Sequence, residues 1–131
     1  MDRTSSSKLV IDAHVHLGRS YSWASYESYV FDTPVGRQED FNHVVFSRIM
    51  KDIGIDMAVI MPSKQAAVSG DNAKENETIA AIARDQPEKF VGMALLNPLK
   101  AGATDELARC VDKLGMKALK LHPYAQCYSP L

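Results

Sequence analysis

The sequence has few cysteines, with only Cys110 and Cys127 among its 131 residues. Their separation fits neither a zinc ribbon nor a redox motif. Two cysteines do not make the dense disulfide framework of a small secreted domain, so a reducing, cytoplasmic environment is expected. Cys110 falls on an expected helix, where a small buried side chain is favoured over a reactive nucleophile.

The sequence also lacks any excess of charge of one sign. Lys and Arg total 15, Asp and Glu total 16, and the formal net charge is -1. No block of like charges occurs, so neither a nucleic acid nor a membrane surface is an expected partner. No apolar run approaches the ~20 residues that span a bilayer. The polar segment 1–8 is expected to be a flexible N-terminus without the apolar core of a signal peptide, and 9–131 a single domain.

Hydrophobic periodicity predicts an alternation of strands and helices. The predicted elements, in chain order, are strand 8–17, helix 39–53, strand 55–61, helix 73–85, strand 90–96, helix 104–114 and strand 116–123. Gly54 and Gly115 are expected to end helices, and Thr104 to be an N-cap. Such alternation is typical of an α/β fold with a parallel sheet and right-handed crossovers. The aromatic-rich segment 19–38 is expected to be a loop that acts as a lid.

Histidines gather where predicted strands end. His14 and His16 lie at the end of the first strand, and His122 at the end of the fourth. Ligands of parallel sheets bind at the carboxyl ends of the strands. Residues i and i+2 of a strand are roughly 6.5–7 Å apart, so both imidazoles can lean onto one ion. This placement favours a metal site over a buried strand whose imidazoles are only hydrogen-bonded.

Strict alternation extends this face of the sheet to further residues. Asp12 is expected on the same face as the two histidines, as a ligand, as a partner of a ligand, or as a carboxylate deeper in the fold. On the fourth strand, Lys120 and His122 share a face. A buried lysine needs a partner, and Asp12 would serve if the two strands lie close. A hydrogen-bonding role at the strand end stays open for His122. Asn76-Glu77 is expected on a solvated helix face, without chemistry.

Four segments in this order resemble a known family: "IDAHVHLG", "GIDMAVIMPS", "PEKFVGMALLNP" and "GMKALKLHPYAQCYSP". They resemble the N-terminal half of the amidohydrolase-related family, whose members are (β/α)8-barrel metalloenzymes. The resemblance implies a half barrel corresponding to strands 1–4 of a TIM barrel. It implies that His14 and His16 bind a divalent metal, usually zinc, with manganese as the alternative and Asp12 as a further ligand in some relatives. Lys120 and His122 match positions near the site and are the catalytic candidates.

The activity that the resemblance implies is metal-dependent hydrolysis of a small organic substrate, aromatic or carboxylate-bearing, through a metal-activated water. A non-oxidative decarboxylase of the same family is the alternative, as is a truncated, non-catalytic remnant that only self-associates. A (β/α)8 barrel typically needs ~250 residues. The family's later ligands and its aspartate have no counterpart here, so whether the chain is itself an enzyme stays open. Its expected partners are a small-molecule substrate and either a second copy or a complementing C-terminal half.

Overall fold

The computed structural model describes residues 8–18, 42–63 and 72–129. The lid predicted over 19–38 lies outside these residues, and so does the predicted flexible N-terminus except for Lys8.

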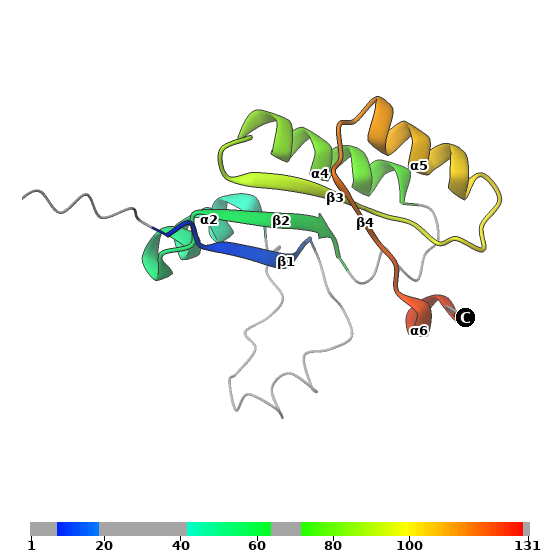
Figure 1. The fold of residues 1–131 in the computed structure, drawn as a ribbon, viewed down its shortest axis with the longest axis horizontal. Coiled ribbons are helices and arrows are strands. Elements are labelled where there is room, and N and C mark those ends of the chain that lie inside the picture. Colours follow the sequence, from blue (N-terminus) through cyan, green and yellow to red (C-terminus); the bar gives the residue numbers. More distant parts are fainter. Residues whose placement is uncertain (1–7, 19–41, 64–71, 130–131) are drawn as a thin grey trace, which may run out of the picture.

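The described residues form a parallel sheet whose strands alternate with helices (Figure 1). The elements are β1 (Ile11–Leu17), α2 (His43–Ile53), β2 (Met57–Pro62), α4 (Ala73–Asp85), β3 (Phe90–Leu95), α5 (Ala103–Asp112), β4 (Ala118–Lys120) and α6 (Pro123–Gln126). The strand order is β1-β2-β3-β4, and each neighbouring pair is parallel. The predicted α/β class and parallel sheet are therefore confirmed, and among the described strands β1 and β4 are the two edges.

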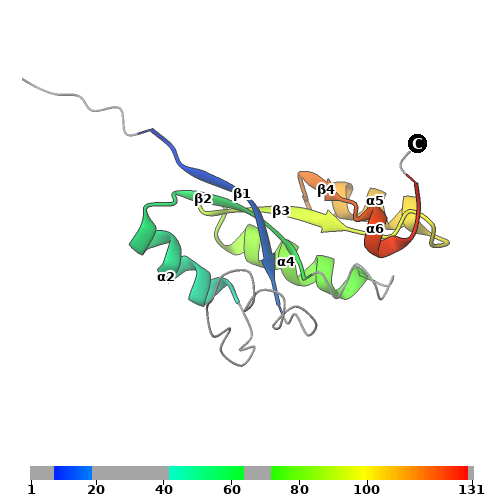
Figure 2. The ribbon, with the colours of Figure 1, turned by 90° about the horizontal axis from the view of Figure 1, so that it is seen from below.

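One face of the sheet packs against the helices. Alternate residues of the inner strands, such as Ile60 and Ala94, join a single core with Phe46 of α2, Ile79 of α4 and Cys110 of α5. Cys110 is fully buried, as predicted for a small core residue. Figure 2, turned by 90° from the view of Figure 1, shows α2 and α4 on the same side of β2 and β3. The opposite face of the sheet would line the inside of a closed barrel.

The ends of α2 show why this helix forms where it does. The side chain of Asn42 accepts hydrogen bonds from the backbone N–H groups of Val44 and Val45 at 3.0 and 3.1 Å. These are donors that a helix leaves without an internal partner. Gly54 ends the helix as predicted, in the left-handed conformation with φ 77°. That conformation favours glycine because it has no Cβ.

Other boundaries differ from the prediction. Thr104 is not the N-cap of α5, because the helix begins at Ala103 after Gly102, which has φ 81°. The fourth strand, predicted over 116–123, covers only the three residues of β4. Its predicted last residue, Pro123, is instead the first residue of α6. Proline suits the first position of a helix, where its missing N–H costs nothing.

Asn76 contradicts the prediction of a solvated helix face. It has no exposed surface, and its side chain clamps the backbone of Leu95 at the end of β3. Its Oδ1 accepts from the Leu95 N–H at 2.9 Å, and its Nδ2 donates to the Leu95 carbonyl at 3.0 Å. Nδ2 also donates to Glu106 Oε1 at 3.0 Å. Three elements, α4, β3 and α5, therefore meet at one amide. Glu77, its neighbour, is exposed as predicted.

Glu106 is the centre of the polar network beside this amide. Arg109 donates to its two carboxylate oxygens at 2.7 and 3.0 Å and reaches Glu77 at 2.7 Å. The hydrogen bonds from Arg109, followed by that from Asn76, lower the pKa of Glu106 from 4.5 to about 2, against the opposing effect of burial. Burial and the adjacent Glu106 raise the pKa of the Cys110 thiol to about 12. Cys110 therefore stays protonated, as expected of a structural cysteine rather than a nucleophile.

Candidate metal site at the end of β1

The imidazoles of His14 and His16 converge near the carboxyl end of β1. Their Nε2 atoms lie 3.1 Å apart, and their ring centroids lie 5.0 Å apart at an interplanar angle of 55°. With metal–nitrogen distances of about 2.0–2.1 Å, this separation corresponds to a nitrogen–metal–nitrogen angle of about 98°, between the octahedral and tetrahedral values. The pair therefore has the spacing of two ligands of one ion.

The orientation of His16 is set by the neighbouring strand. Its Nδ1 lies 2.6 Å from the carbonyl oxygen of Pro62, at the end of β2. A carbonyl only accepts, so a neutral His16 carries its proton on Nδ1 and has a lone pair on Nε2. Histidines that bind metals commonly have their second nitrogen held in this way. In a neutral His16 this contact therefore leaves Nε2 as the nitrogen with the lone pair.

Gly18 lies two residues after His16, directly after the last residue of β1. It has φ 110°, a backbone conformation that side chains with a Cβ rarely adopt. A Cβ at this position would lie 3.5 Å from the Cβ of Ser63, which is an ordinary contact. The positive φ of Gly18, rather than a lack of space, is therefore what favours glycine here.

A β-bulge separates Asp12 from the histidines. Asp12 is in register with Ala58, whereas Val15 is in register with Ile60 and His16 with Met61, so β1 has one extra residue in between. One extra residue reverses the face of every side chain on one side of it. Asp12 therefore aligns with the helix-facing Ala58, and the prediction that it shares a face with both histidines is wrong. Its Oδ1 instead accepts from the His14 backbone N–H at 3.0 Å.

Lys120 and His122 lie at the other edge of the sheet. Lys120 is in register with Leu95, on the face opposite to the helices. β2 and β3 separate β1 from β4, which at ~4.8 Å per strand is roughly 14 Å along the sheet. The condition for a Lys120–Asp12 pair, that the two strands lie close, is not met.

His122 is joined to the end of β3 through α6. Its backbone N–H donates to Gln126 Oε1 at 3.0 Å, and Gln126 Nε2 donates to the Leu96 carbonyl at 2.8 Å. Gln126 is buried and was missed by the sequence analysis. The available signal was Pro123, which favours a helical turn directly after His122.

Among the described residues, two imidazole nitrogens come together at the end of β1. Over 8–18, 42–63 and 72–129, no three His, Cys, Asp or Glu side chains come together in a way that could hold an ion. Two imidazole nitrogens suit zinc better than manganese, which prefers oxygen ligands. The donor set therefore fits one side of a zinc site.

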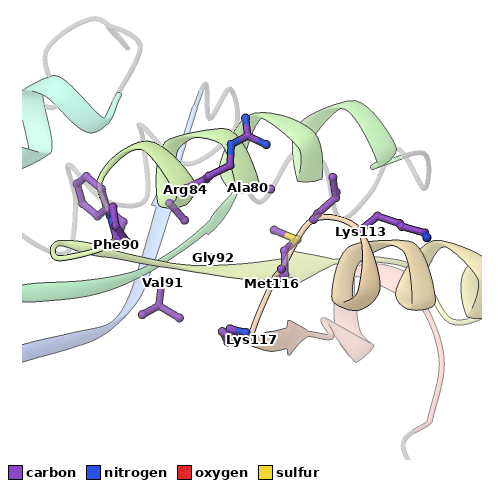
Figure 3. A pocket seen from close by; sticks show the side chains of 12 residues that line it. Ala80, Arg84, Phe90, Val91, Gly92, Lys113, Met116 and Lys117 are labelled. Atoms are coloured by element: carbon purple, nitrogen blue, oxygen red, sulfur yellow. The ribbon is translucent and has the colours of Figure 1, made fainter.

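A cavity of about 410 Å³ lies between α4, β3 and the turn before β4 (Figure 3). Its buried lining residues are Ala80, Phe90, Gly92 and Met116. Phe90 and Gly92 lie at the amino end of β3, whereas ligands of parallel sheets bind at the carboxyl ends. The cavity is therefore separate from the histidine pair.

Among the helices that the structure describes, none is long and apolar enough to cross a bilayer.

Comparisons with known proteins bear on the fold. No protein-family model matches the sequence, and no curated protein matches it. A similar solved structure is 5-carboxyvanillate decarboxylase LigW from Sphingomonas paucimobilis, with 16% identity and a TM-score of 0.59. The match covers 85% of this chain and 42% of that chain. The chain therefore has the α/β fold of a partial barrel, as predicted, and spans less than half the length of the structure it matches.

Proposed function

We propose that this chain carries the metal-binding part of a barrel decarboxylase of the amidohydrolase-related type, acting on an aromatic or other small organic carboxylate. The observation that carries the proposal is the convergence of the His14 and His16 Nε2 atoms at 3.1 Å. The likeness in fold to a protein named as a decarboxylase favours decarboxylation over metal-dependent hydrolysis, which the sequence analysis ranked first.

Four residues of this chain would each have a distinct role in the proposed site. His14 and His16 would hold a divalent ion, zinc or alternatively manganese, while the Pro62 carbonyl fixes the tautomer of His16. When bound, such an ion acts as a Lewis acid that polarises a substrate oxygen. Lys120, on the face opposite to the helices, would attract a carboxylate. His122 is the candidate for delivering the proton that replaces the lost CO2 on the substrate carbon.

The proposed site needs ligands beyond the two imidazoles. A catalytic zinc usually has three protein ligands and one water. The match with the decarboxylase covers 42% of that chain, so the remaining ligands would come from a complementing C-terminal half or from a second copy.

Metal content tests the site. Purified chain is incubated with zinc, dialysed and measured by elemental analysis beside the double variant His14→Ala/His16→Ala. We expect zinc to be retained by the original chain and lost from the variant. His43→Ala, which removes a histidine at the start of α2, is the matched control and should retain zinc. Equal zinc in all three proteins would refute the proposed site.

A second assay distinguishes the two reactions. The zinc-loaded chain, alone and with a C-terminal half supplied by a related barrel, is offered aromatic carboxylates in one series and esters and lactones in another. Release of CO2 that a chelator abolishes would support decarboxylation. Chelator-sensitive hydrolysis without CO2 release would support the hydrolase alternative.

A further inference from the structure

Gln126 joins the ends of two neighbouring strands. Both backbone groups of His122 are bonded to it: the N–H donates to Gln126 Oε1 at 3.0 Å, and the carbonyl accepts from the Gln126 N–H at 2.9 Å. Gln126 Nε2 donates to the Leu96 carbonyl at 2.8 Å. One residue therefore ties the chain that leaves β4 to the chain that leaves β3.

These bonds begin where the pairing of the two strands ends. The last pair in register is Leu95 with Lys120, and Leu96 and His122 follow it by one and two residues. Gln126 and Leu96 expose only 5% and 6% of their surfaces. Loss of the amide would therefore leave a buried carbonyl without this partner, which is costly.

The turn that carries Gln126 depends on this attachment. α6 has four residues, too few for a helix that is stable by itself. Tyr124 in the same turn exposes 89% of its surface, so it does not fasten the turn to the sheet. The side chain of Gln126 returns to the N–H of the residue before the helix, as the glutamine of a capping box does. The backbone of His122 is therefore held by Gln126.

We propose that Gln126 is a positioning residue for His122: by bonding its backbone to the end of β3, Gln126 fixes the place from which the imidazole projects. The inference rests on the proposed function, in which His122 delivers a proton to the substrate carbon. A proton donor has to lie within hydrogen-bond reach of the atom that it serves, and a displacement of about 1 Å can lower a rate by about 100-fold. Gln126 therefore acts on the rate through His122, without contact with the substrate.

Nuclear magnetic resonance of the chain tests the positioning directly. Two variants are compared with the original chain: Gln126→Ala, and Gln126→Met, which keeps the length of the side chain but loses both bonds. In each we expect the His122 amide to exchange with solvent about tenfold faster, and the imidazole signal of His122 to move. The imidazole signals of His14 and His16, at the far edge of the sheet, should stay in place.

Two controls separate positioning from general stability. Tyr124→Ala alters the same turn at an exposed side chain and should leave the His122 signals unchanged. Asn76→Ala removes the amide that bonds Leu95 and should lower the free energy of unfolding without moving the imidazole signal of His122. A chain with Gln126→Met whose His122 signals match those of the original would show that Gln126 only fills space, and would overturn the inference.

Release of CO2 by the zinc-loaded chain, complemented with a C-terminal half, tests the consequence for the reaction. Gln126→Met should lower kcat by about 10- to 100-fold with KM unchanged, because the histidine pair and Lys120 are untouched. An unchanged kcat beside displaced His122 signals would overturn the positioning role and leave the proposed function standing. Absence of CO2 release from the original chain would refute the proposed reaction, and the role of Gln126 in that reaction with it.

Discussion

Asn76 holds the ends of a strand and two helices in place with one side chain. Its amide satisfies both backbone groups of Leu95 and one oxygen of Glu106. The sequence could not reveal this, because an Asn-Glu pair on a helix is usually solvated. Its burial depends on where the end of β3 lies, which is a tertiary fact rather than a local one.

Replacement of this residue, Asn76→Ala, should destabilise the protein by about 2–4 kcal/mol, because it leaves buried backbone groups of Leu95 without partners. Urea denaturation measures the loss. Glu77→Ala is the matched control on the same helix. It breaks an exposed pair with Arg109, which should cost less than ~1 kcal/mol. Equal losses for the two variants would contradict the role of Asn76.

The titration of the Glu106 carboxyl group makes the free energy of unfolding depend on pH in the acidic range. Its pKa is about 2 in the folded chain, against 4.5 for an unperturbed carboxyl. The unfolded chain therefore binds a proton first as the pH falls. The stabilisation from Glu106 is complete above pH 4.5 and is lost between about pH 4.5 and pH 2.

The loss over this interval should reach about 3 kcal/mol, because each unit of pKa difference corresponds to 1.36 kcal/mol and the side chain is largely shielded from solvent. The variant Glu106→Gln removes this titration while other carboxyls still titrate. We expect its unfolding free energy to fall less steeply over that interval, as measured by denaturant titration at a series of pH values. Parallel curves for the two proteins would rule out this role.

Among the elements, α2 depends on signals at its own ends. Asn42→Ala removes the acceptor for the Val44 and Val45 N–H groups and should cost about 0.5–2 kcal/mol. Asn42→Ser keeps an oxygen that can accept these bonds and should stay within ~0.5 kcal/mol of the original chain. Urea denaturation distinguishes the two variants. A loss with Ser as large as that with Ala would show that the cap is not what stabilises this end.

Elements with strong local sequence signals are predicted well. The irregular part of β1 is not, because it depends on pairing with another strand. Helix 73–85 was predicted to the residue, because its apolar face and the following Pro87 both mark it. The apolar alternation of 11–17 is regular and predicts a straight strand. The bulge between Asp12 and Val15 comes from pairing with β2, which no local pattern contains. The alternation correctly puts His14 and His16 on one face at the end of the strand, whereas it assigns Asp12 to the wrong face.

At the scale of the whole molecule, the alternation of elements was sufficient to predict a parallel sheet covered by helices. It could not show how distant strand ends meet. The positions of Lys120 and His122 depend on β4 lying at the far edge from β1 and on α6 turning back to the end of β3. Both features depend on tertiary contacts between residues remote in sequence.

The spatial order of the strands is also their order in the chain, which has a consequence for synthesis on the ribosome. Each strand that emerges therefore finds its preceding neighbour in the sheet already made. Chains grow at about 5–20 residues per second, and N-terminal parts generally fold first. β1 and the end of β2 that holds His16 can therefore pair once Pro62 has left the exit tunnel, before β3 and β4 are available.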